Sequence, residues 1–177
     1  MRLIEADRLG AGSSGGTCAV MLAAKYPDLF SAFVSLDGQL GPNSGTKSQT
    51  VARLFGGDAD AWAAFDPRTL IERHGRYDNL SAWLGVSDDT PTVHRPAGDT
   101  PPDPAAITDW DQYSEEHAAN ADKLCALLSG HNVECSVVGY GGSHDFPSAG
   151  DGFAAALPWL AGELGTPNAP THPMPGA

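Results

Sequence analysis

The sequence has few cysteines, no long hydrophobic run and no signal-peptide pattern. Its three cysteines, Cys18, Cys125 and Cys135, cannot all pair within the chain, and none lies at C-x-x-C spacing. We therefore predict no metal site and no redox site, and expect each cysteine to be a small buried hydrophobic residue. Because no apolar run approaches the roughly 20 residues of a transmembrane helix, we expect a soluble chain without membrane insertion. The sequence leaves its compartment open.

Basic residues are also scarce. The 177 residues include 10 Lys and Arg against 22 Asp and Glu, which gives a net charge of −12 without any basic cluster. Such a surface repels phosphate backbones, so nucleic-acid binding is not expected. The length is typical of one domain, and a content of 41% hydrophobic residues is sufficient for a folded core.

Apolar runs alternate with segments of helical pattern along the chain. Buried strands are predicted at residues 29–36, 79–87 and 133–140, and the main helices at residues 17–26, 110–130 and 151–164. This order is typical of an α/β fold with a parallel sheet and helices on both faces. Two shorter helices are expected at 47–55 and 58–65, the second capped by Asp58.

Proline marks the segments outside this pattern. Five prolines fall within residues 90–109, which we predict to be a long exposed loop. Residues 165–177 are also Pro-rich and are predicted to be a disordered tail. The expected organisation is therefore one α/β domain over residues 1–164, followed by the tail.

Residues 10–16 read GAGSSGG and fit two motifs at once. Gly10, Gly12 and Gly15 fit G-x-G-x-x-G, the turn that places a dinucleotide pyrophosphate at a helix N-terminus, and Asp37 follows near the spacing of the ribose-binding carboxylate. Gly12, Ser14 and Gly16 fit G-x-S-x-G, the turn that exposes a nucleophilic serine. Both motifs need a strand, a tight turn and a helix, so the loop alone does not separate them.

The residues after two later strands favour the nucleophile. A serine hydroxyl needs a base to take its proton, and the base needs an acid to orient it. Asp88 and Asp89 directly follow the strand at 79–87, and His144 lies in a Gly-rich loop after the strand at 133–140. This is the order Ser, Asp, His of α/β-hydrolases, with Asp89 as the fallback acid. The other histidines are predicted to be surface residues: His74, His94, His117, His131 and His172.

Three segments resemble a known family. GSSGGTCAVMLAAKYPDLFSAFVSLDG (12–38), GVSDD (85–89) and YGGSHDF (140–146) resemble the nucleophile elbow, acid loop and histidine loop of the putative esterase family of α/β-hydrolases. That family includes esterase D type enzymes, feruloyl esterases and antigen 85 mycolyltransferases, and the resemblance extends over residues 10–164. It implies Ser14 as nucleophile, Asp88 as acid, His144 as base and the Gly15 N–H as an oxyanion donor. It also implies a small-molecule ester substrate and no cofactor.

The sequence departs from this family in two places. Ser143 stands between the two glycines and His144, where the family usually has Gly-Gly-His. Only nine residues precede the GAGSSGG loop, where the family has several strands. We therefore expect the C-terminal part of an α/β-hydrolase fold, with an exposed sheet edge through which the chain could associate.

The leading hypothesis is hydrolysis of carboxylic esters through an acyl-serine intermediate on Ser14. An acyltransferase with the same triad is an alternative, because only the acceptor of the acyl group differs. A hydrolase fragment without activity, acting as a binding or assembly piece, is a further alternative. A dinucleotide-binding domain ranks third.

Overall fold

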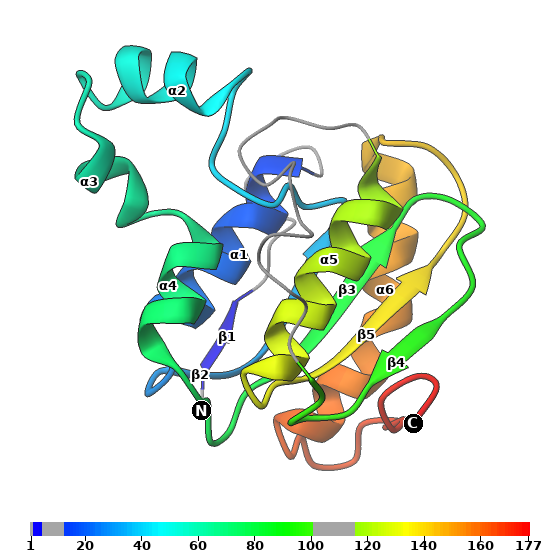
Figure 1. Cartoon of the computed structure of the whole chain (residues 1–177). Helices are drawn as coiled ribbons and strands as arrows, with labels where there is room; N and C mark the ends of the chain where they lie inside the picture. Colours follow the sequence, from blue (N-terminus) through cyan, green and yellow to red (C-terminus); the bar gives the residue numbers. More distant parts are fainter. Residues whose placement is uncertain (1, 5–12, 101–115) are drawn as a thin grey trace.

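A mixed sheet forms the centre of the fold. The computed structural model describes residues 2–4, 13–100 and 116–177, and its five strands lie in the order β1-β2-β3-β5-β4 (Figure 1). The strands are β1 (Arg2–Ile4), β2 (Phe30–Leu36), β3 (Ser81–Val86), β4 (Val93–Arg95) and β5 (Glu134–Gly139). All pairs are parallel except β4 with β5, which is antiparallel. The carboxyl ends of β2, β3 and β5 therefore meet at one edge.

Helices cover both faces of the sheet, as the sequence predicts. On one face α1 (Ser13–Lys25) packs on β2 and α5 (His117–Gly130) on β5, with α4 (Pro67–His74) against both helices. On the other face lies α6 (Phe146–Glu163). Between β2 and α4 the chain leaves these layers in an excursion that holds α2 (Lys47–Leu54) and α3 (Ala59–Ala63) (Figure 1). The predicted α/β class is confirmed.

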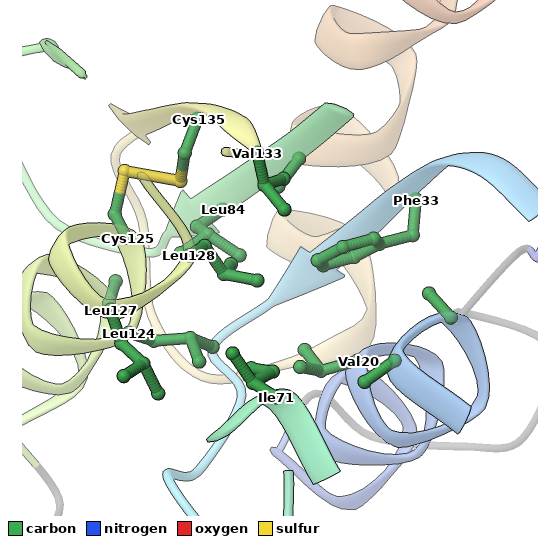
Figure 2. Packing of buried hydrophobic residues seen from close by; sticks show 14 of the residues in the cluster. Val20, Phe33, Ile71, Leu84, Leu124, Cys125, Leu127, Leu128, Val133 and Cys135 are labelled. Atoms are coloured by element: carbon green, nitrogen blue, oxygen red, sulfur yellow. A yellow bond between two sulfur atoms is a disulfide. The ribbon is translucent and has the colours of Figure 1, made fainter. Parts of the chain in front are cut away.

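Side chains of β2 alternate between two hydrophobic clusters. Phe33 points into the larger cluster, where Val20 of α1 and Leu128 of α5 also lie (Figure 2). Its neighbours Ala32 and Val34 belong to the cluster on the α6 face, with Trp159. Successive residues of a strand face opposite sides of a sheet, so a run such as FSAFVSL has apolar residues on both faces because both sides are covered.

Two of the three cysteines form a disulfide, which corrects the prediction that each is only a small buried hydrophobic residue. Cys125 of α5 and Cys135 of β5 lie 5.6 Å apart at their Cα atoms and are bonded through sulfur (Figure 2). Both are fully buried, as predicted. Their pairing follows from the packing of α5 directly on β5, which sequence spacing does not specify. Cys18 is free and half-buried.

The predicted strands are confirmed to within about two residues, and several other elements differ. Residues 93–95, expected in an exposed loop, form β4, because β5 offers an open edge with which they can pair. Helix α4, which was not predicted, begins at Pro67, where Asp66 accepts a hydrogen bond from the Thr69 N–H at 2.9 Å. Helix α6 begins at Phe146 instead of residue 151, since Asp145 caps it. Asp58 caps α3 as predicted. The start of the predicted helix at 110–130 and part of the loop at 90–109 lie outside the described residues.

The prediction of a disordered tail at 165–177 is also corrected. Met174 is 5% exposed and belongs to the cluster that contains Trp83 and Trp159. The Ser136 hydroxyl of β5 donates a hydrogen bond to the Pro175 carbonyl at 2.7 Å. The tail thus packs against β3, β5 and α6. Its buried methionine, this hydrogen bond and one from the His172 N–H to the Pro158 carbonyl hold a segment of otherwise polar and Pro-rich composition.

Within the described part of the chain, no helix is both long and apolar enough to span a bilayer.

Candidate active site

The loops at the carboxyl edge of the sheet hold most of the predicted site residues. Leu36 of β2 pairs with Gly85 of β3, and Gly85 pairs with Val138 of β5, so the chain leaves the three strands side by side. In parallel α/β sheets, ligands bind at this edge. Asp37 follows β2, Asp88 and Asp89 follow β3, and His144 follows β5.

Ser14 lies exposed in the first turn of α1, followed by the buried Gly15 and Gly16. The first N–H groups of a helix have no partner within it, so the N–H of Gly15 is of the kind that can stabilise an anion. Gly16 allows α1 to approach β2 closely, because a Cβ there would lie 2.9 Å from the Leu36 carbonyl oxygen. Gly10 and Gly12, the first glycines of the loop, lie outside the described residues.

Ser14 lines a largely apolar cavity of about 310 Å³. Thr17, Cys18 and Met21 continue the same face of α1 beyond Ser14, since residues three, four and seven positions apart share one side of a helix. The opposite walls are the loop after β2 together with Leu54 and Phe65 of the excursion. One wall of the cavity is therefore a face of α1 that begins at Ser14.

Asp37 links the ends of three strands. Its Oδ1 accepts a hydrogen bond from the Ser87 N–H at 2.8 Å, and its Oδ2 accepts one from the Tyr140 hydroxyl at 2.7 Å. The residue is 2% exposed and has a φ of 47°, in the left-handed region that few residues other than glycine, Asn and Asp adopt. Such burial disfavours the ribose-binding role that Asp37 would have in a dinucleotide site.

Burial raises the pKa of the Tyr140 phenol, and its hydrogen bond to Asp37 and the charge of Asp37 raise it further. The phenol therefore stays protonated at physiological pH and remains a donor to Asp37.

The loop before His144 depends on glycine and on the inserted serine. Gly141 and Gly142 have φ values of 70° and 101°. The Ser143 hydroxyl donates to Asp145 Oδ2 at 2.5 Å, which with hydrogen bonds from Ser148 lowers the pKa of Asp145. Asp145 in turn caps α6 through the Ser148 N–H. Ser143 therefore anchors the loop to the start of α6 immediately beside His144.

The structure brings His144 to Asp37 and to His117. Nδ1 of His144 is 3.8 Å from Oδ2 of Asp37 and 3.1 Å from Nε2 of His117, whose ring stacks on it at 4.7 Å between centroids. Both histidines line a cavity of about 770 Å³ with Asp88 and Glu116. In the described residues these three side chains can also offer a metal ion one ligand atom each, all within 4.8 Å of one another.

The other predicted residues are less closely connected. Asp88 and Asp89 are exposed, and Asp88 Oδ1 accepts a hydrogen bond from the Thr90 N–H at 2.8 Å. Asp88 shares the larger cavity with His144, whereas Ser14 lines the smaller one. Among the described residues, no hydrogen bond joins Ser14 to His144.

Sequence reasoning did not identify Asp37 and His117 as neighbours of His144. A signal for Asp37 was present, since it is the first polar residue after a buried strand, as Asp88 is after the next. The sequence around His117 gives no such signal. His117 is the first residue of α5, and only the tertiary packing of this helix brings it to the carboxyl edge of the sheet.

Comparison with known proteins supports the family resemblance of the segments around this site. The sequence model of the family described as "Putative esterase" matches residues 7–148, which contain Ser14, Asp88 and His144. An uncharacterized protein of Corynebacterium glutamicum is 42% identical over 65 residues, which are 37% of this chain and 15% of that protein. The chain therefore corresponds to a small part of the length of that relative. Because the family match covers most of the chain, the protein belongs to the putative esterase family.

Proposed function

We propose that the protein hydrolyses carboxylic esters through an acyl-serine intermediate on Ser14. The observation that carries the proposal is the position of Ser14, which is exposed at the N-terminus of α1 and lines a largely apolar cavity, in a chain of an esterase family. In this mechanism the Ser14 Oγ attacks the ester carbonyl carbon and His144 accepts the hydroxyl proton. The alcohol leaves with a proton from His144, and water then releases the acid by the reverse steps.

The N-terminus of α1 supplies electrostatic stabilisation in this mechanism. The tetrahedral intermediate places negative charge on the former carbonyl oxygen, and the Gly15 N–H would donate to it. The positive end of the helix dipole acts in the same direction. Loss of one such donor typically lowers the rate by about 10²–10³-fold.

Two carboxylates compete to orient His144. Asp88 lies in the loop that resembles the acid loop of the family, and it lines the same cavity as His144. Asp37 is favoured by distance, because among the described residues its Oδ2 is the carboxylate oxygen within 4.0 Å of the His144 ring nitrogens. We propose Asp37 as the positioning residue in the arrangement the structure describes and keep Asp88 as the second candidate.

The cavity beside Ser14 suggests the acyl side of the substrate. Its volume of about 310 Å³ is near the lower end of the roughly 300–1,000 Å³ typical of small-molecule sites. Met21, Leu54 and Phe65 give it apolar walls, and none of its lining residues in the described part of the chain is charged. We propose that it accepts an unbranched apolar acyl chain, so that p-nitrophenyl butyrate and hexanoate are turned over with higher kcat/KM than the acetate.

The test is hydrolysis of these p-nitrophenyl esters by the purified chain and its variants. Ser14→Ala should abolish turnover above the rate in buffer, while the neighbouring Ser13→Ala keeps most of it and serves as the matched control. Equal turnover by the wild type and Ser14→Ala would refute the nucleophile. Absence of turnover by folded wild-type protein with every ester would favour the inactive-fragment alternative.

The two carboxylates are separated by Asp37→Asn and Asp88→Asn, both neutral and nearly isosteric. Loss of the orienting carboxylate lowers kcat by up to about 10⁴-fold in known triads. We expect Asp37→Asn to show the larger loss and to shift the acidic limb of the kcat/KM pH profile, which reports the free histidine. A larger loss and shift in Asp88→Asn would instead assign the role to Asp88.

A further inference from the structure

Asp37, His117 and His144 form a cluster in which the proposed ester hydrolysis accounts for Asp37 and His144 but not for His117. They come from three separate places in the chain: the end of β2, the first residue of α5 and the loop after β5. Nδ1 of His144 lies 3.1 Å from Nε2 of His117 and 3.8 Å from Oδ2 of Asp37. A triad needs one carboxylate beside its histidine and has no use for a second imidazole against the same nitrogen.

The separations are close to those of a tetrahedral metal site. Zinc binds imidazole nitrogen and carboxylate oxygen at about 2.0–2.2 Å, which places neighbouring ligand atoms about 3.3–3.5 Å apart. The two distances at His144 bracket this value, and the three ligand atoms all lie within 4.8 Å of one another. Side-chain shifts of roughly 1 Å would therefore bring all three to one ion.

The surroundings suit a cation. Asp37 is buried, and its carboxylate is already held by the Ser87 N–H and the Tyr140 hydroxyl, the kind of outer contact that orients metal-binding carboxylates. Asp88 and Glu116 add negative charge to the walls of the adjoining cavity of about 770 Å³. This cavity leaves a fourth coordination position open to water, as in zinc sites with three protein ligands.

We propose that Asp37, His117 and His144 bind a divalent transition-metal ion of the zinc type. A metal on Nδ1 of His144 fixes the remaining ring proton on Nε2, so that Nε2 can no longer accept the proton of the Ser14 hydroxyl. Metal binding therefore also inhibits ester hydrolysis. The inhibition rests on the proposed function, whereas the metal site does not.

Metal binding is tested directly with Co²⁺, whose visible absorption reports coordination by nitrogen and oxygen ligands, and with Zn²⁺ as competitor. The chelator-treated wild type, Ser14→Ala and His172→Ala should each bind one ion per chain that Zn²⁺ displaces. His172 lies exposed in the tail, so this variant is the matched control for loss of a histidine. His117→Ala and Asp37→Asn should bind at least tenfold more weakly, with circular dichroism confirming that they are folded.

Equal Co²⁺ binding by the wild type and His117→Ala, or no Co²⁺ absorption in the wild type, would overturn the site. Inhibition is measured as the rate with Zn²⁺ divided by the metal-free rate of the same variant, and His117→Ala should need at least tenfold more Zn²⁺ for half-inhibition. Co²⁺ binding is measured directly and does not depend on esterase activity, so the metal site can be tested even if the hydrolase proposal fails. A folded wild type that binds Co²⁺ yet is fully active with Zn²⁺ would refute the inhibitory step.

Discussion

Replacing Asp37 by alanine should be among the most destabilising single changes in the described part of the protein. The substitution removes the acceptor of two hydrogen bonds, from the Ser87 N–H at 2.8 Å and from the Tyr140 hydroxyl at 2.7 Å. Tyr140 does not compensate by ionising, because burial, the largest cause of its raised pKa, remains after Asp37 is replaced. The carboxylate is 2% exposed, so water cannot replace it without local rearrangement.

The expected loss follows from the number of donors left without a partner. Each donor left unsatisfied costs about 1–3 kcal/mol when buried, and Ser87 and Tyr140 are partly buried. Alanine at a φ of 47° adds roughly 1 kcal/mol of backbone strain. Relief of the buried charge offsets part of this sum, so we expect Asp37→Ala to lower the free energy of unfolding by about 2–5 kcal/mol. Asp37→Asn keeps one acceptor and tolerates the left-handed conformation, so about 1–2 kcal/mol is expected.

Urea unfolding followed by tryptophan fluorescence measures these differences, provided that the slope of unfolding free energy against urea is unchanged. Tyr140→Phe is the matched control, because it removes one of the two donors and should cost about 1 kcal/mol. A stability of Asp37→Ala within about 0.5 kcal/mol of the wild type, the usual range for surface substitutions, would refute the reasoning. It would mean that Asp37 does not hold the ends of β2, β3 and β5 together.

Two other stability predictions follow from buried or partly buried groups. The Cys125–Cys135 disulfide closes a short loop, with a sequence separation of 10, so its reduction should lower the free energy of unfolding by about 3 kcal/mol. The stability of a Cys125→Ala/Cys135→Ala variant should not change with reductant. A wild type whose stability is the same with and without reductant would contradict the bond. Glu163 near the end of α6 has its pKa raised above the ordinary 4.5, mainly by burial and then by the charge of Glu134. A carboxyl group with a raised pKa in the folded protein stabilises the folded state when the pH is below the ordinary pKa of 4.5. This stabilisation is lost as the pH rises through the pKa of the folded protein. Glu163→Gln should therefore melt at a higher temperature than the wild type at pH 7, with the difference disappearing below pH 4.5; the same difference at both pH values would rule out titration as the cause.

The sheet and the edge that holds the candidate site could be predicted because both depend on local patterns. Apolar runs bounded by polar turns identified β2, β3 and β5, and parallel connection placed their carboxyl ends together. Asp88 and His144 were thereby predicted to lie at one edge of the sheet. The face of α1 that Ser14 shares with Thr17, Cys18 and Met21 likewise follows from helical spacing.

The pairing of side chains across that edge could not be predicted. Asp37 and Asp88 both follow buried parallel strands, and the sequence does not say which lies closer to a histidine on the next strand. His117 reaches His144 through the packing of α5, a contact between residues 27 positions apart. The partner of Cys125 was unspecified for the same reason, since three cysteines permit three different pairs.

The central claim, that Ser14 is the nucleophile, is tested most directly by the site of covalent labelling. Intact mass and peptide mapping after reaction with a fluorophosphonate should show one adduct per chain, on Ser14, in the wild type and in Ser13→Ala. Ser14→Ala should carry none, and prior incubation with a substrate ester should slow the labelling of the wild type. An adduct on another residue, or equal labelling of the wild type and Ser14→Ala, would contradict the account.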